Sequence, residues 1–147
     1  MSRKSAERFS EKDMAQDMQD LVKVAIAARA HAHAPYSKFY VGAAMRDETG
    51  KIHGGCNIEN AAYPQGWCAE CSAIASLVMS GAKCITEVAV LGNGDELCTP
   101  CGGCRQKIRE FAALDVKIHC CTETGKLIRS FTLEELLPAS FGPENLR

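Results

Sequence analysis

Two short cysteine motifs are the residues of this sequence best suited to chemistry. One is Cys-Ala-Glu-Cys at 68–71 and the other is Pro-Cys-Gly-Gly-Cys at 100–104, and each opens a stretch with helical character. A thiolate at a helix amino terminus is stabilised by unpaired backbone N–H groups and by the positive end of the helix dipole. Zinc binds such sulfurs, and a catalytic zinc site has three protein ligands and one position for water. Cys68, Cys101 and Cys104 would supply three ligands.

Glu70 follows the first of these cysteines by two residues, which places it close to the metal but on a different side of the helix from Cys68. A carboxylate in that position can carry protons. Zinc deaminases of nucleobases have this layout: a His or Cys, then x-Glu, then Pro-Cys-x-x-Cys, with a Glu that is not a ligand. The two motifs therefore predict zinc-dependent deamination with Glu70 as the proton shuttle.

The same cysteines allow two other interpretations. With Cys71 included, the paired Cys-x-x-Cys spacings are typical of a structural zinc site with four thiolates, and spacing alone favours that site. Glu70 and the motifs described below favour catalysis, because a structural site has no use for them. A redox role for Cys101 and Cys104 is disfavoured, since a thioredoxin-like motif follows the first strand of its unit and needs no second cysteine cluster.

Hydrophobic periodicity predicts the elements that position these motifs. The predicted helices cover 14–32, 68–79, 101–111 and a short stretch from Thr132, and the predicted strands cover 41–45, 52–57, 87–91, 116–121 and 127–131. Strands joined through helices, after an initial hairpin, indicate a mixed sheet with helices on both faces. We therefore expect an α/β fold, a three-layer α-β-α sandwich around a mixed five-stranded sheet.

Length and composition narrow the classes of protein. A chain of 147 residues predicts a single domain over 1–147, in which we expect 1–12 to form a flexible amino-terminal extension. A formal net charge of -1 gives no field to hold a polyphosphate chain, so a nucleic-acid partner is disfavoured. We find neither a signal peptide nor an apolar run of membrane-spanning length, and therefore expect no membrane partner and a cytoplasmic protein with reduced thiols.

Five ordered motifs resemble those of the small, homotetrameric class of cytidine deaminases. They are APYSKFYVGAA at 34–44, NIENAAYP at 57–64, WCAE at 67–70, TPCGGCRQ at 99–106 and LLPASF at 136–141. The resemblance implies hydrolytic deamination of cytidine and deoxycytidine to uridine and deoxyuridine with release of ammonia, a reaction of pyrimidine salvage. It also implies one Zn²⁺ per subunit and a homotetramer with active sites shared between subunits.

The resemblance further implies roles for residues that would contact the nucleoside. Asn57 and Glu59 would hydrogen-bond the ribose 3'-hydroxyl, Phe39 would border the pyrimidine, and the backbone of Ala69 would contact the base. Glu70 would carry a proton from water to N3 of the base and then to the departing amino group. A deaminase of a cytosine-containing antibiotic would share the zinc site but has less need for the ribose-binding pair, so Asn57 and Glu59 favour the nucleoside.

Three further residues are implied to act between subunits. Ala61 and Tyr63 would reach the 5'-hydroxyl of a nucleoside bound in a neighbouring subunit, and Phe141 from yet another subunit would stack on the base. Such sites would be complete only in the tetramer, and they suit a free nucleoside. A polynucleotide deaminase would instead need a basic channel and an open 3' side.

The chain departs from the family pattern at Cys71, where many cytidine deaminases have an Arg that resembles a charge partner for the zinc thiolates. Three thiolates and one Zn²⁺ sum to -1, and a bound hydroxide makes -2, so the site needs compensation. The helix dipoles, or hydrogen bonds from Arg105 and Gln106, could provide it. We expect Cys71 to remain a protonated thiol beside the metal ligands, because a fourth thiolate would close the position needed for water.

Overall fold

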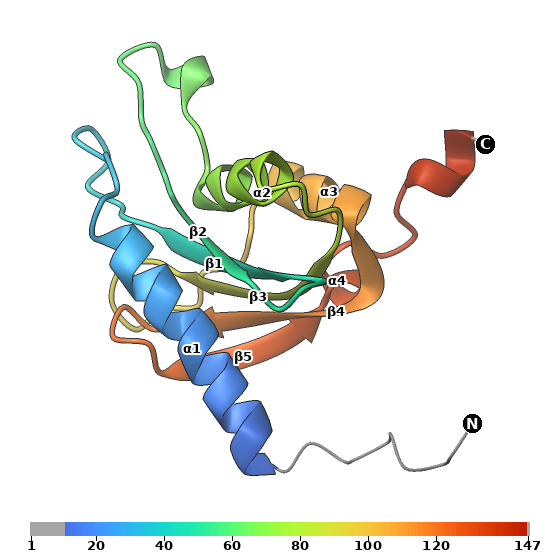
Figure 1. Cartoon of the computed structure of the whole chain (residues 1–147). Coiled ribbons are helices and arrows are strands. Elements are labelled where there is room, and N and C mark those ends of the chain that lie inside the picture. The colour runs from blue at the N-terminus through green and yellow to red at the C-terminus, as the bar shows by residue number, and fades with distance from the viewer. Residues whose placement is uncertain (1–10, 147) are drawn as a thin grey trace, which may run out of the picture.

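The computed structural model describes residues 11–146, which form one sheet with helices on both faces (Figure 1). The five strands follow the order β2-β1-β3-β4-β5, in which β3 and β4 are parallel and the other neighbouring pairs are antiparallel. The strands are β1 (Gly42–Asp47), β2 (Ile52–Cys56), β3 (Ile85–Leu91), β4 (Ala112–Cys121) and β5 (Leu127–Thr132). The predicted mixed five-stranded sheet is confirmed.

The helices form the two outer layers. The long helix α1 (Glu11–Arg29) covers one face of the sheet, as the blue ribbon in Figure 1 shows, and α2 (Ala69–Met79) and α3 (Gly102–Phe111) cover the other. The short helix α4 (Leu133–Leu136) packs on the α2 face through Leu133, which is fully buried there. The predicted three-layer sandwich is therefore confirmed. No helix within 11–146 combines the length and the apolar character needed to cross a bilayer.

Two hydrophobic cores result from the alternation of side chains along the strands. On β3, Val88 and Val90 join the core beneath α2 and α3, whereas Ala89 and Leu91 join the core beneath α1. All four side chains are fully buried. A central strand with helices on both faces needs apolar residues at every position, and this explains the continuous apolar run in the sequence.

Several element boundaries differ from the predicted ones. The first helix covers 11–29 rather than 14–32, so that residues 11 and 12, assigned to the extension, belong to α1, and the rest of that extension lies outside the described residues. The strand β4 begins at Ala112 rather than 116, because α3 runs directly into it after Phe111. Its first four residues alternate between half-buried and exposed, which weakens the apolar signal there.

A pair of adjacent glycines lets α1 and α2 approach β2 from opposite faces. A Cβ atom on Gly55 would lie 2.3 Å from the carbonyl oxygen of Ala69 and 2.4 Å from the backbone nitrogen of Ala73. On Gly54 a Cβ would lie 3.0 Å from Cγ1 of Val24 in α1. The first turn of α2, which carries the first cysteine motif, is thus positioned by direct backbone contact with β2.

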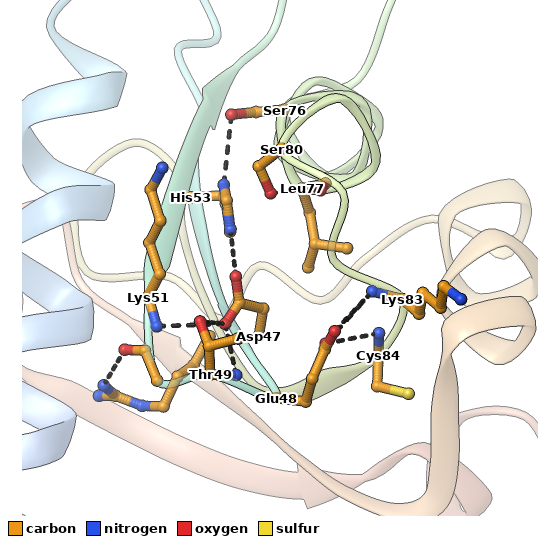
Figure 2. A network of polar contacts seen from close by, with 12 residues as sticks. Asp47, Glu48, Thr49, Lys51, His53, Ser76, Leu77, Ser80, Lys83 and Cys84 are labelled. Carbon is orange, nitrogen blue, oxygen red and sulfur yellow. Dashed lines mark hydrogen bonds and ion pairs between the residues drawn. The ribbon is translucent and has the colours of Figure 1, made fainter.

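Polar contacts fasten the β1–β2 hairpin to the middle of α2 (Figure 2). Oδ2 of Asp47 lies 2.7 Å from Nε2 of His53, and Nδ1 of the same ring lies 3.4 Å from the hydroxyl of Ser76. Oδ1 of Asp47 accepts hydrogen bonds from the hydroxyl and the backbone N–H of Thr49. These contacts, led by the Thr49 hydroxyl and the His53 ring, hold the pKa of Asp47 well below its usual value.

Candidate active site

Three cysteine sulfurs meet where the amino termini of α2 and α3 converge. The Sγ atoms of Cys68, Cys101 and Cys104 lie within 4.8 Å of one another, and those of Cys68 and Cys101 are 4.0 Å apart. A tetrahedral zinc ion with Zn–S distances of about 2.3 Å places its sulfur ligands roughly 3.8 Å apart. The three thiols therefore fit a zinc ion by both donor chemistry and spacing.

Cys68 and Cys101 occupy equivalent positions at the amino termini of α2 and α3. Cys68 precedes α2 and Cys101 precedes α3 as the N-cap residue, each with an extended backbone and no hydrogen bond from its side chain to its own helix. The sulfurs are thus free to point at a shared ligand. Burial opposes ionisation of Cys101, but hydrogen bonds from the Cys104 backbone and from neighbouring thiols lower its pKa overall. Burial raises the pKa of Cys68 to about 11, so a metal ion would have to displace its proton.

Cys71 lies beside this cluster but outside it. Its Sγ is 4.0 Å from that of Cys104, yet it does not share the mutual spacing that joins the other three sulfurs. The side chain is buried, as is Cys104, whereas Cys68 and Cys101 are exposed. Cys71 and Cys104 therefore form the more buried side of the group of four cysteines.

Glu70 occupies the first turn of α2 and is almost completely buried, with 4% of its surface exposed. Burial raises the pKa of its carboxyl group. The residue nevertheless lines an open cavity together with Cys68 and Cys101. A buried carboxyl that borders the same cavity as the sulfurs is placed to exchange protons with a molecule bound there.

The cavity has a volume of about 710 Å³, within the range of pockets that hold small organic ligands. Most of the residues predicted to contact substrate line it, namely Phe39, Asn57, Glu59, Tyr63 and Ala69. Tyr36, Trp67, Cys98 and Thr99 also contribute to its wall. Ala61 and Phe141 do not line the cavity of their own chain, although both are exposed.

Asn57 and Glu59 make contacts that the sequence did not indicate. The side-chain amide of Asn57 donates to the carbonyl oxygen of Phe39 at 2.8 Å and accepts from the N–H of Val41 at 2.9 Å. One carboxylate oxygen of Glu59 accepts from the backbone N–H groups of Tyr36, at 3.0 Å, and of its neighbour at 37, at 3.1 Å. Both side chains thereby hold the segment 36–41, which forms one wall of the cavity.

Arg29 and Asn93 also hydrogen-bond the backbone of the segment 36–41. The sequence did not indicate either residue. The guanidinium of Arg29 donates to the carbonyl oxygen of Tyr40 at 2.9 Å and to Oδ1 of Asn93 at 2.8 Å. Asn93 donates to the carbonyl oxygen of Lys38 and accepts from the N–H of Tyr40. Arg29 also pairs with Glu123 at 3.1 Å. No motif marks these residues, because their partners are distant in the sequence.

Arg105 and Gln106, considered as hydrogen-bond donors to the thiolates, are directed elsewhere. Arg105 donates to the carbonyl oxygens of Pro100 and Leu136 and to the hydroxyl of Thr99. Gln106 donates to the carbonyl oxygen of Phe141 at 2.9 Å. Arg105 thus braces the loop that precedes α3, and Gln106 anchors the carboxy-terminal segment.

Comparison with known proteins agrees with this geometry. The family model described as "Cytidine and deoxycytidylate deaminase zinc-binding region" matches residues 15–120, which include both cysteine motifs. The cytidine deaminase of Sporosarcina psychrophila is 39% identical over 88% of this chain and 95% of its own length. That of Halalkalibacterium halodurans is 38% identical over 88% of this chain and 98% of its own.

Solved structures give the same result. The crystal structure of cytidine deaminase from Burkholderia pseudomallei superposes with a TM-score of 0.78 at 37% identity, covering 84% of this chain and 98% of that one. Cytidine deaminase from Mycobacterium tuberculosis gives a TM-score of 0.75 at 33% identity, covering 86% and 98%. Sequence, fold and the convergence of three thiols beside a buried carboxyl lead to one conclusion: the chain belongs to the cytidine deaminase family.

Proposed function

We propose that this chain binds one zinc ion through Cys68, Cys101 and Cys104 and hydrolyses cytidine and deoxycytidine to uridine and deoxyuridine, releasing ammonia. The observation that carries the proposal is the meeting of three sulfurs, within 4.8 Å of one another, at a cavity that the buried Glu70 also lines. The similar proteins are named cytidine deaminases, which gives the substrate. The reaction is one of pyrimidine salvage in the cytoplasm.

Cys68, Cys101 and Cys104 would hold the zinc ion, which would supply activation of a water molecule as the nucleophile. Glu70 does the proton transfers: it accepts a proton from that water, delivers it to N3 of the base, and so makes C4 more electrophilic. The carboxylate then takes the remaining proton from the hydroxyl now on C4 and gives it to the departing amino nitrogen, so that a C4 carbonyl forms and ammonia leaves. A single carboxyl can serve in both directions because it can accept and release a proton, and burial beside the cavity raises its pKa, which favours the protonated form.

The cavity wall orients the nucleoside. Phe39 borders the pyrimidine and the backbone of Ala69 contacts the base, while Asn57 and Glu59 hydrogen-bond the ribose 3'-hydroxyl. The last two side chains already hold the segment 36–41, so they are fixed in place before substrate arrives. Such prior positioning reduces the entropy lost on binding.

We further propose a homotetramer in which neighbouring subunits complete each site. Phe141 lies outside the cavity of its own chain and is 58% exposed, which leaves its ring available to a neighbour. Ala61 is exposed in the same way. Tyr63 lines its own cavity but is 74% exposed, so it can also reach the 5'-hydroxyl of a nucleoside in the adjacent subunit.

A structural zinc site with four thiolates is the main rival. It requires Cys71 to join the other three sulfurs, but Cys71 approaches Cys104 at 4.0 Å from the interior side and stays outside the mutual cluster. A structural site would hold zinc and catalyse nothing.

The test is an absorbance assay of cytidine, deoxycytidine and cytidine monophosphate, with zinc measured on the same samples. We expect both nucleosides to be deaminated and the monophosphate to react poorly. Glu70→Gln should retain zinc and fold while losing nearly all turnover, because an amide cannot shuttle the protons. Zinc without deamination in the wild type would establish the structural rival, and substantial turnover by Glu70→Gln would refute the mechanism.

Site sharing has its own test by subunit mixing. Glu70→Gln and Phe141→Ala, each impaired alone, are co-expressed with different affinity tags and the mixed oligomer is isolated. Sites that combine an intact Glu70 from one subunit with an intact Phe141 from another should regain activity. Mixed oligomers no more active than the parents would contradict sharing.

A further inference from the structure

A cluster of three thiolates around one Zn²⁺ keeps a net negative charge, and this chain lacks the Arg that many related deaminases carry at position 71. Neither Arg105 nor Gln106 compensates, because each donates its hydrogen bonds to backbone carbonyls or to Thr99. A cation close to the sulfurs must therefore come from another position, or the dipoles of the two helices must suffice.

Lys107 is the cation placed to do this. It lies three residues after Cys104 on α3, the spacing that puts two side chains on the same face of a helix. Its Nζ lies 3.6 Å from where a Cβ on Gly103 would stand, so the side chain folds back along α3 toward the amino terminus and the sulfurs.

The sulfurs act on this ammonium in return. Cys71 is the largest cause of an elevated pKa for Lys107, with smaller contributions from Cys104 and Cys68. Cys71 and Cys104 are themselves 4.0 Å apart at the interior side of the cluster.

We propose that Lys107 supplies the positive charge that offsets the zinc–thiolate cluster, and that it replaces from α3 the Arg that related deaminases carry on α2 at the position of Cys71. This inference rests on the zinc site of the proposed function. Lys107 touches neither substrate nor metal, so it is a positioning residue that acts through the sulfurs. The inference is supported by the position of Lys107 one turn after Cys104 on α3 and by the approach of its Nζ to Gly103 in the first turn of that helix.

The experiment measures zinc affinity, by competition with a chromophoric chelator at fixed pH and low salt. Lys107→Met should bind zinc about tenfold more weakly than the wild type. Removing a residue that supports metal ligands typically weakens metal binding by about 10- to 100-fold. We expect the lower value because Lys107 is exposed to solvent, which screens its charge. Lys107→Arg should retain the wild-type affinity. Lys51→Met is the matched control, since it removes one exposed lysine charge from the hairpin turn (Figure 2) and should leave zinc affinity unchanged.

A double variant separates charge from packing. Cys71→Arg in the Lys107→Met background should restore zinc affinity to near the wild-type value, and 0.5 M salt should narrow the gap between Lys107→Met and wild type. Equal affinity of Lys107→Met and Lys51→Met would overturn the inference, as would a loss that Cys71→Arg does not repair. Absence of zinc from the wild type would instead refute the proposed function itself.

Discussion

At Gly55 a single added methyl group should displace the first turn of α2 and with it the active site. Replacement by Ala would place a Cβ 2.3 Å from the carbonyl oxygen of Ala69 and 2.4 Å from the backbone nitrogen of Ala73. Both obstacles are backbone atoms in the first turns of α2, which cannot rotate away as a side chain could. The helix must move as a unit, and Glu70 must move with it.

The size of that movement follows from the distances. Ordinary van der Waals contact for a Cβ begins at 3.4 Å, so the first turn of α2 must retreat by about 1 Å from β2. Zinc sites tolerate ligand displacements of about 0.2 Å, and a 1 Å misplacement of reacting groups can cost roughly 100-fold in rate. Forcing the extra methyl into the packed layer should also cost about 1–3 kcal/mol of stability.

Urea denaturation, zinc content and cytidine turnover measured together test this reasoning. Gly54→Ala is the matched control on the same strand, because its new Cβ would meet side chains of α1, first Cγ1 of Val24 at 3.0 Å, on the face away from the site. We expect Gly54→Ala to retain zinc and most activity, and Gly55→Ala to be about 100-fold slower or zinc-free while still folded. If both variants kept wild-type zinc and turnover, backbone contact with β2 would not position the site.

Three other changes have definite expected outcomes. Cys71→Ser should retain one zinc per chain by elemental analysis, because its sulfur lies outside the cluster of three; a variant that lost zinc would make Cys71 a ligand. Arg29→Ala should raise the KM for cytidine about tenfold, because the segment 36–41 loses hydrogen bonds to a charged group, each of which contributes about 1.5–3 kcal/mol. An unchanged KM would show that this segment stays ordered without Arg29. Asp47→Asn should lower the urea midpoint at neutral pH. Folding lowers the pKa of Asp47, so its contribution to the free energy of unfolding is complete above its ordinary pKa of 3.8 and is lost as the pH falls below that value. The urea midpoints of the wild type and Asp47→Asn should therefore converge in acid. A constant difference between them down to about pH 2 would contradict the assignment.

Most of the fold could be predicted from periodicity because each element buries a regular set of side chains. The alternation around Val88 to Leu91 and the helical spacing in α1 both report burial directly. Boundaries were less predictable where burial is incomplete. At the start of β4, half-exposed residues follow Phe111 without a turn, and no local signal separates helix from strand.

The cysteine motifs could be identified because zinc chemistry imposes a local spacing at helix starts, and the structure brings Cys68, Cys101 and Cys104 together. Lys107 could not be assigned in the same way. A long side chain one turn after Cys104 can point to solvent or back toward the sulfurs, and the spacing along α3 does not distinguish the two orientations. Sequence spacing carries information about ligands on one element and little about partners contributed by another.

The hydrogen bonds of Arg29 have a consequence for the order of events during synthesis and folding. Its partners Tyr40, Asn93 and Glu123 lie 11, 64 and 94 residues further along the chain. The contacts with Asn93 and Glu123 form late, because the intervening chain must first be made and closed into a loop. A nascent chain that has not yet extended past Glu123 already contains every cysteine of the metal cluster, but the wall beside Phe39 lacks its last anchor. Capacity for zinc should therefore precede capacity for substrate as the protein emerges from the ribosome.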